Sequence, residues 1–174
     1  NQRCLITNGL AAKLSALSRI LEAETFDGML VFVRTKIQTV ELAEQLVALG
    51  YAAAPLNGDI QQSQRLRTVE QLKAKKIDIL VATDVAARGL DIKSLAAVIN
   101  YELPRDPEIY VHRIDRSGRA GGSGIALSIF TEAEQIRVNA IEEYLKKPCV
   151  CDVYASLDRA PGFSLKTPLV TIQL

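Results

Sequence analysis

The chain has 174 residues, of which 48% are hydrophobic and 24% are charged, and its formal net charge is +1. This length fits one domain, and the composition excludes a disordered chain. A net charge so close to zero also excludes a global basic field, so any contact with nucleic acid must come from local basic clusters.

Strand patterns recur along the chain at intervals that leave room for a helix between them. Runs of apolar, β-prone residues predict strands, over residues 29–33, 51–56, 77–82, 96–101 and 125–130. Residues 3–7 are compatible with a further short strand or a lead-in. The uninterrupted apolar run at 29–33 indicates a strand that is covered on both faces, as in a parallel sheet.

Helix signals fill the intervals between these strands. Apolar residues at helical spacing predict helices over about 11–23, 35–50, 60–75 and 131–146, and one that starts at 106 and runs into a cluster of arginines. The N-termini are marked by two capping boxes, by an Asp-Pro pair and by one aspartate after a turn, at Thr35 with Gln38, Thr131 with Glu134, Asp106-Pro107 and Asp59.

Alternating strands and helices with short connections predict an α/β fold with a mainly parallel sheet and helices on both faces. In such sheets, ligands bind beyond the carboxyl ends of the strands. Several polar segments follow predicted strands, namely 34–36, 57–59, 83–84 and 88–91. The folded domain is expected over 1–148. Residues 149–174, where the periodic pattern weakens and Pro161, Gly162 and Pro168 occur, are expected to form a tail or linker, and both ends of the chain look like cuts in a longer protein.

An unusual cluster lies in YVHRIDRSGRAG, where Arg113, Arg116 and Arg119 follow one another at three-residue intervals. The guanidinium group suits planar, multidentate capture of phosphate oxygens, and the glycines that follow permit close approach of the backbone. The functional interpretation is a phosphate clamp. The structural alternative is a solvated basic helix end that stabilises the helix dipole.

The cysteine and histidine content narrows the chemistry. Cys4, Cys149 and Cys151 are an odd set without zinc spacing, which indicates a reducing compartment and no disulfide framework. The single histidine, His112, disfavours most metal and triad chemistries. Neither a signal peptide nor an apolar run of ~18 residues is present, so we expect a cytoplasmic protein without membrane contact and without a metal site.

Four segments in this order resemble the motifs of the second RecA-like domain of DEAD-box ATP-dependent RNA helicases, namely VFVRTK (31–36), NGDIQQSQR (57–65), VATDVAARGLDI (81–92) and YVHRIDRSGRAG (110–121). The resemblance covers about residues 3–147 and implies a RecA-like three-layer sandwich. ARGLDIKSL, NYELPRDPE and the final VTIQL look most like the bacterial DbpA-like subgroup, whose members carry a further RNA-binding domain after such a tail.

The resemblance also implies roles for individual residues. Arg116 and Arg119 are expected to be catalytic arginine fingers that reach the γ-phosphate of ATP bound on the N-terminal RecA-like domain. The residues expected at the ATP and at the interdomain contact are Arg88, Gly89, Asp91, His112 and Arg113, with Asp91 on the ribose. The residues expected along the RNA backbone are Arg34, Thr35, Gly58, Gln62, Arg65, Thr83 and Asp84. Because these contacts go to the backbone, RNA should be bound without sequence specificity.

One departure from the family pattern and one set of missing motifs affect these expectations. Asp115 stands where the family's HRIGR has glycine, and we expect its carboxylate to neutralise part of the arginine cluster or to obstruct domain closure. The chain also lacks a GxxxxGK[ST] phosphate loop and the DEAD and SAT sequences. ATP and Mg²⁺ are therefore expected to be held mainly by the N-terminal domain, and this fragment alone should be inactive.

Two other functions remain open at this point. The chain could be a non-catalytic RNA- or protein-binding module that has lost ATPase function, with Asp115 as the lesion. It could also be a DNA-directed relative from the wider helicase superfamily.

Overall fold

The structure is a computed structural model that describes residues 2–7, 10–23, 27–92, 95–117, 124–148 and 151–153. The described strands form one sheet in the order β3-β4-β2-β5-β6-β1-β7, and every pairing between them is parallel. The strands are β1 Gln2–Thr7, β2 Met29–Phe32, β3 Ala53–Leu56, β4 Ile79–Ala82, β5 Ala97–Asn100, β6 Ile125–Thr131 and β7 Cys151–Val153.

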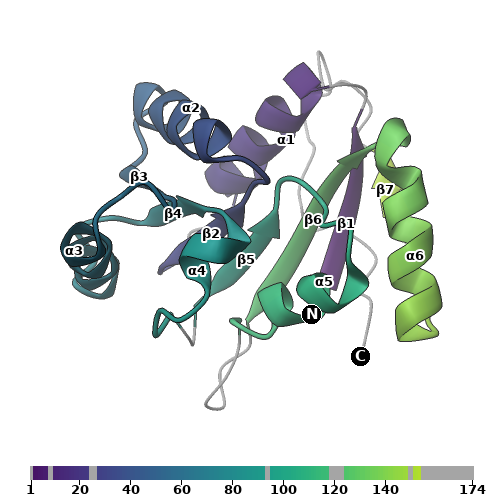
Figure 1. Ribbon diagram of the computed structural model, residues 1–174. Helices are drawn as coiled ribbons and strands as arrows, with labels where there is room; N and C mark the ends of the chain where they lie inside the picture. Colours follow the sequence, from purple (N-terminus) through teal and green to yellow (C-terminus); the bar gives the residue numbers. More distant parts are fainter. Residues whose placement is uncertain are drawn as a thin grey trace.

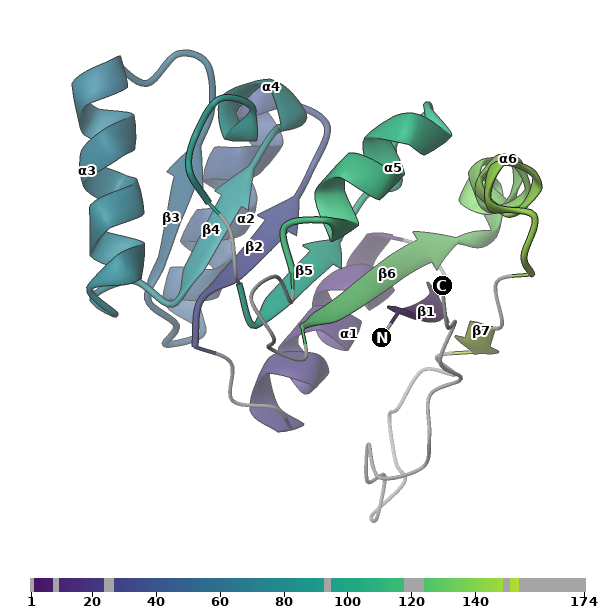
Figure 2. The same cartoon turned by 90° about the horizontal axis from the view of Figure 1, so that it is seen from below.

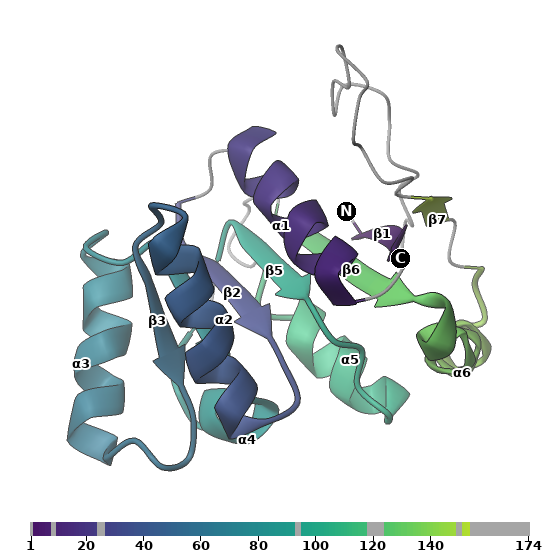
Figure 3. The ribbon, with the colours of Figure 1, turned by 90° about the horizontal axis from the view of Figure 1, so that it is seen from above.

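Helices connect these strands and cover both faces of the sheet (Figure 1). The helices are α1 Leu10–Ala23, α2 Lys36–Ala48, α3 Gln62–Lys73, α4 Asp84–Ala87, α5 Pro107–Ile114 and α6 Gln135–Leu145, the last preceded by the 3₁₀ turn η1 Glu132–Glu134. Seen from below, α3, α4, α5 and α6 lie on one side of the sheet (Figure 2), and seen from above, α1 and α2 lie on the other (Figure 3). The predicted α/β three-layer architecture is therefore confirmed.

Strand β2 shows why three layers form. Its side chains alternate between the two faces: Met29 and Val31 pack into the core beneath α1 and α2, whereas Leu30 and Phe32 pack into the core beneath α3 and α4. All four side chains are buried. A strand that is apolar at every position is stable only with helices on both faces, which is why its uninterrupted apolar run predicted this architecture.

The local signals at helix starts are mostly confirmed. Thr35 and Gln38 form a capping box, as do Thr131 and Glu134, and Asp106 caps α5 ahead of Pro107. The predicted cap at Asp59 is wrong, because α3 begins later, with Gln61 as its N-cap and no side-chain capping bond. The carboxylate of Asp59 instead pairs with Lys36 Nζ at 2.6 Å.

Strand β7 had no counterpart among the predicted elements. It pairs in parallel with β1, with Cys151 opposite Cys4. A strand of three residues is too short to show a period of two, and it joins the sheet edge through backbone hydrogen bonds that any residues can make. The proposed domain boundary at residue 148 stays a prediction.

Candidate functional site

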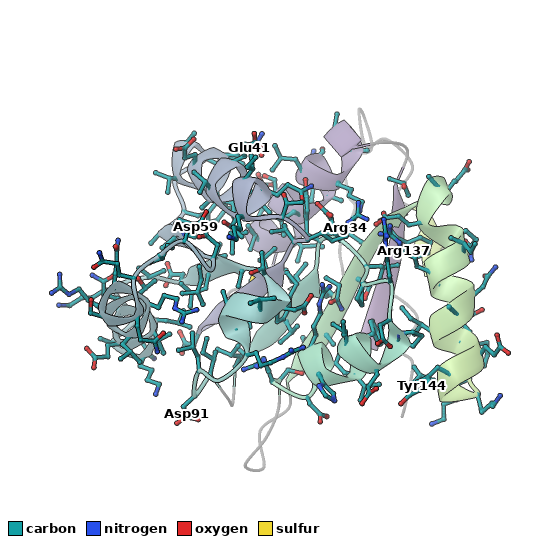
Figure 4. All side chains as sticks on the ribbon, in the orientation of Figure 1. Arg34, Glu41, Asp59, Asp91, Arg137 and Tyr144 are labelled. Carbon is teal, nitrogen blue, oxygen red and sulfur yellow. The ribbon has the colours of Figure 1, made fainter. Side chains whose placement is uncertain are left out.

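The parallel sheet brings the polar segments after its strands to one edge. Along that edge, the strand order places Gly58 after β3, Thr83 after β4, Arg34 after β2 and Glu102 after β5. Figure 4 shows Asp59 and Arg34 at similar height, whereas Asp91 lies well below them. The carboxyl edge is therefore a continuous row of polar groups drawn from segments distant in sequence, as expected for a ligand-binding edge.

Arg113 lies at the centre of the site and points inward. Its side chain is 1% exposed, and its Nε and Nη2 donate to the two carboxylate oxygens of Asp84, each at 2.7 Å. Nη1 donates to Asn100 Oδ1 at 3.1 Å and to the backbone oxygen of Glu102 at 2.7 Å. The guanidinium also lies over the ring of Phe32, 4.7 Å from its centre. A bidentate carboxylate, two further acceptors and an aromatic face together make burial of this charge tolerable.

These contacts hold the guanidinium of Arg113 within its own domain. The expected interdomain role of Arg113 stays a prediction. Asp84, which is 26% exposed, is held by the same pair. Arg113 thus positions Asp84 at the start of α4 and ties α5 to the end of β4.

Arg116 follows α5 and leans back onto the domain. Nη2 donates to the backbone oxygen of Ala87 at 2.9 Å, and Nη1 donates to that of Ile92 at 3.3 Å. The side chain is half-buried and also lines an open hollow of about 60 Å³ between α4 and α5. The hollow is bounded by Phe32, Asp84, Ala87, Arg88, Ile109, His112, Arg113 and Arg116. Arg119 lies outside the described residues.

Of the remaining residues expected at the nucleotide, His112 and Arg88 line this hollow, whereas Gly89 and Asp91 are not part of its lining. His112 is 69% exposed, with Nε2 3.8 Å from a carboxylate oxygen of Glu108, so it is not a core histidine. Arg88 lines the hollow, and Gly89 turns the chain at a φ of +79° that favours glycine. Asp91 is 77% exposed and 4.0 Å from Lys73 Nζ, a separation worth little at the surface.

Asp115 is the C-cap of α5 and is exposed, with right-handed helical backbone angles. The position therefore does not require glycine for conformational reasons. Any effect of the substitution must come from the carboxylate or from its bulk beside Arg116.

The two threonines expected along the RNA backbone serve as helix N-caps. Thr35 accepts a hydrogen bond from the backbone N–H of Gln38 at 3.2 Å, and Thr83 accepts one from that of Ala86 at 3.4 Å. A hydroxyl that accepts such a bond keeps its own proton to donate. The hydroxyl of Thr35 already donates to Gln38 Oε1 at 2.9 Å. Capping and binding of a phosphate oxygen are therefore compatible at Thr83, whereas Thr35 would have to give up its bond to Gln38 Oε1.

Gln62 and Arg65 meet on the first turn of α3. Arg65 Nη2 donates to Gln62 Oε1, and Arg65 Nε is the buried side-chain nitrogen or oxygen without a hydrogen-bond partner within the described residues. Gly58 precedes them, and a Cβ there would meet only Lys36, with Cε at 3.6 Å. The guanidinium group of Arg65, with Nη2 bonded and Nε unpaired, thus lies near the N-terminus of α3, which no side chain caps.

Three residues that hold Arg113 had not been predicted to belong to the site. Phe32, Asn100 and Glu102 lie at the carboxyl ends of β2 and β5, and Asn100 also donates from Nδ2 to Ser128 Oγ at 3.2 Å. The only sequence signal was their position at or after the end of an apolar strand. Their role depends on β2 and β5 being neighbours in the sheet, which the sequence pattern does not specify.

The described part of the chain contains neither a cluster of metal-ligating side chains nor a helix that could span a membrane. No group of three or more His, Cys, Asp or Glu side chains there is arranged to hold a metal ion. No helix there has both the length and the apolar character needed to cross a bilayer.

The fold and this edge define a RecA-like α/β domain with an arginine-rich site, and comparisons with known proteins assign it to a family. Residues 12–121 match the family described as the helicase conserved C-terminal domain. The C-terminal domain of the DEAD-box protein Dbp5 superposes with a TM-score of 0.79 at 30% identity, over 87% of this chain and 89% of that one. The chain therefore belongs to the helicase conserved C-terminal domain family and is a C-terminal domain of the DEAD-box RNA helicase type.

Two further relatives agree with this assignment. The Escherichia coli DEAD-box protein SrmB, in a crystal structure with regulator of ribonuclease activity A, superposes with a TM-score of 0.82 at 30% identity, over 92% of this chain and 97% of that one. The ATP-dependent RNA helicase DeaD of Mycobacterium tuberculosis is 54% identical over 134 residues, which are 77% of this chain and 24% of that protein. The chain thus spans about a quarter of the length of the curated relatives it matches. The narrower DbpA-like assignment stays a prediction.

Proposed function

We propose that this domain is the second half of an ATP-dependent RNA helicase, in which it binds the RNA backbone and supplies arginine fingers to a nucleotide held by the first half. The observation that carries the proposal is the Arg113–Asp84 pair, which joins the α5 segment of Arg116 to the β4 segment of Thr83. Residues expected at ATP and residues expected at RNA thus share one buried ion pair. A cytoplasmic location is part of the same proposal.

The fit of this chain to ATP is partial. The hollow beside Arg88, His112 and Arg116 is lined by the guanidinium groups of Arg88 and Arg116, which can face phosphate oxygens. The chain has no phosphate loop, and its described residues form no cluster of metal ligands. ATP and its Mg²⁺ would therefore be held by the N-terminal RecA-like domain, with this domain closing over the exposed phosphates.

Arg116 is the described arginine placed to act in this way. Hydrolysis of ATP supplies the free energy of the cycle, and charge that develops on the γ-phosphate is compensated by a trans-acting guanidinium worth ~10³–10⁵ in rate. In its contacts to Ala87 and Ile92, the guanidinium meets neutral backbone oxygens. Exchange of these neutral acceptors for an anion on domain closure would be favourable, because charge-assisted hydrogen bonds are stronger. Arg119 is proposed as the second finger on the resemblance alone.

The RNA side rests on donors that face the carboxyl edge. Thr83 offers a hydroxyl proton, Gly58 permits close approach of a backbone, and Arg65 offers the charge of its guanidinium group, whose Nε is buried. Thr35 would have to exchange its bond to Gln38 Oε1 for one to RNA. All of these groups suit phosphate or sugar oxygens and none reads a base edge, so binding should be independent of sequence and strongly dependent on salt.

The test uses the full-length parent protein. Arg116→Gln should lower the RNA-stimulated ATPase rate by about 10³-fold or more while RNA affinity without nucleotide changes little. Arg19→Gln, at an exposed position on α1, is the matched control and should change neither. Unchanged ATPase in Arg116→Gln would refute the finger role, and ATPase that DNA stimulates as well as RNA does would refute the RNA-directed assignment.

A further inference from the structure

A second group of arginines continues the carboxyl edge beyond Arg34. Arg137, in the first turn of α6, donates through Nη1 to the backbone oxygen of Leu103 at 3.1 Å. The same nitrogen lies 3.6 Å from Glu134 Oε1. Arg137 therefore links α6 to the segment after β5, and it lies outside all the motif segments identified in the sequence.

Lys13 determines how much of the charge of Arg137 is compensated. Its side chain is 1% exposed, and Nζ lies 2.6 Å from Glu134 Oε2 and donates to the backbone oxygen of Tyr101 at 2.8 Å. The backbone N–H of Thr131 donates to the same carboxylate oxygen at 2.9 Å. The single carboxylate of Glu134 thus faces two cations, so it cannot neutralise Arg137 fully.

Further positive charge lies close by. Arg34 Nε pairs with Glu102 at 2.7 Å, and Arg105, which is exposed, makes no hydrogen bond or ion pair within the described residues. Burial, and after it the positive charge of Arg34, lower the pKa of Arg137, and Arg105 acts in the same direction. Like charges have therefore been gathered at one place.

We define the edge cluster as four cations and two carboxylates, namely Lys13, Arg34, Arg105, Arg137, Glu102 and Glu134. Its net charge is +2, and it stays positive even when Lys13 releases its proton. The two carboxylates are largely buried, with 6% and 13% of their side chains exposed, and each is held by its own cations. Arg34, by contrast, is 41% exposed. Within this cluster, the charges that solvent meets are therefore mainly the guanidinium groups of Arg34 and Arg105.

The cluster lies in line with the proposed RNA path. The order β3-β4-β2-β5-β6 takes that path from Gly58 past Thr83 to Arg34, and the next positions along the edge belong to Arg105 and Arg137. Asp59, Arg34 and Arg137 form a row in Figure 4. Strands β2 and β6 are two strand spacings apart, or roughly 10 Å, so one RNA strand can contact both.

We propose that Arg105 and Arg137 extend this RNA path past Arg34 and bind further backbone phosphates of the same single strand. The proposal rests on the proposed RNA-binding function of the edge and adds a binding position to it. Glu134 and Lys13 act as positioning residues, because Glu134 holds Arg137 near Leu103 while Lys13 shares the carboxylate and leaves the charge of Arg137 only partly compensated.

The experiment measures binding of the 174-residue chain to fluorescein-labelled oligouridylates of two lengths by anisotropy, over a series of salt concentrations. The double variant with Arg105→Gln and Arg137→Gln should bind the longer oligouridylate roughly tenfold more weakly and leave the shorter one unchanged. The slope of log affinity against log salt should decrease by about 0.7 for each phosphate lost. A double variant that carries Arg137→Lys in place of Arg137→Gln should recover most of the wild-type salt dependence. The control variant Arg19→Gln should bind both oligouridylates as wild type does.

The possible outcomes separate the two proposals. If lengthening the RNA strengthens binding equally in wild type and double variant, while Arg34→Gln and Arg65→Gln weaken binding of both lengths, the extension is wrong and the RNA function stands. If Arg34→Gln and Arg65→Gln also leave binding unchanged, the RNA function of this edge is wrong. If the double variant folds poorly, the single variant Arg105→Gln, at an exposed position, replaces it in the same comparison of the two oligouridylate lengths. A surface that serves an acidic protein instead would leave every RNA affinity unchanged.

Discussion

Arg113 and Arg137 both donate to a backbone oxygen just after β5 and both face a carboxylate, yet their surroundings differ in charge balance. Arg113 has the whole carboxylate of Asp84, in a bidentate pair. Arg137 shares the carboxylate of Glu134 with Lys13. The comparison teaches that the number of cations per carboxylate decides what a buried or partly buried arginine can do. A balanced pair holds the fold together, whereas a shared carboxylate leaves charge for a ligand.

The largest expected effect comes from breaking the balanced pair. Arg113→Met should lower the free energy of unfolding by about 3–5 kcal/mol, because Asp84 is left as a partly buried carboxylate without its cation and Asn100 and Glu102 lose a donor. Urea unfolding of the 174-residue chain measures it. A double-mutant cycle with Asp84→Asn isolates the pair, and a coupling free energy near zero would show that Arg113 stabilises by packing on Phe32 instead.

A smaller effect tests the shared carboxylate through the pH dependence of stability. Burial is the main cause of the lowered pKa of Lys13, whose ordinary value is 10.5. Between the lowered pKa and 10.5 the unfolded chain binds more protons than the folded chain, so a rise in pH through this interval stabilises the fold. Below the folded pKa, this lysine contributes no pH dependence.

Urea unfolding from neutral pH up to about pH 10 should therefore show wild type gaining stability relative to Lys13→Met. The range stops there because Tyr101, whose pKa burial raises from 10.0 to about 12, makes the fold lose stability above it. The matched surface control is Lys76→Met, at an exposed position, which should show no such difference from wild type. A relative loss of stability over the same range would mean that Glu134 outweighs burial and that the charge of Lys13 is fully compensated.

The smallest expected effect concerns Asp115, the C-cap of α5 and the sequence neighbour of Arg116. Asp115→Gly should raise the RNA-stimulated ATPase rate of the full-length parent by roughly two- to fivefold, equivalent to about 1 kcal/mol or less of barrier. Asp115→Asn separates the causes: a rise with both variants indicates charge, and a rise with glycine alone indicates bulk. Equal ATPase rates in wild type, Asp115→Gly and Asp115→Asn would show that Asp115 does not weaken ATP turnover.

Much of this domain could be predicted because its signals are local. A capping box acts within one turn, so Thr35 with Gln38 and Thr131 with Glu134 were readable from three-residue spacing. An uninterrupted apolar run reports burial on both faces, so β2 was recognisable as a strand covered by helices on both sides. The failed cap at Asp59 has a tertiary cause, because Lys36 on another helix takes its carboxylate.

The sequence by itself determined the alternation of strands and helices, and therefore which edge of the sheet carries the polar segments. Only the tertiary structure decided which of these segments meet. The hydrogen bond from Arg113 to Asp84 joins residues 29 positions apart in the sequence, and the one from Lys13 to Tyr101 joins residues 88 positions apart. Hydrophobic periodicity carries no information over such sequence separations. Strand order sets these pairings, and strand order follows from how the helices pack across the sheet rather than from any local pattern.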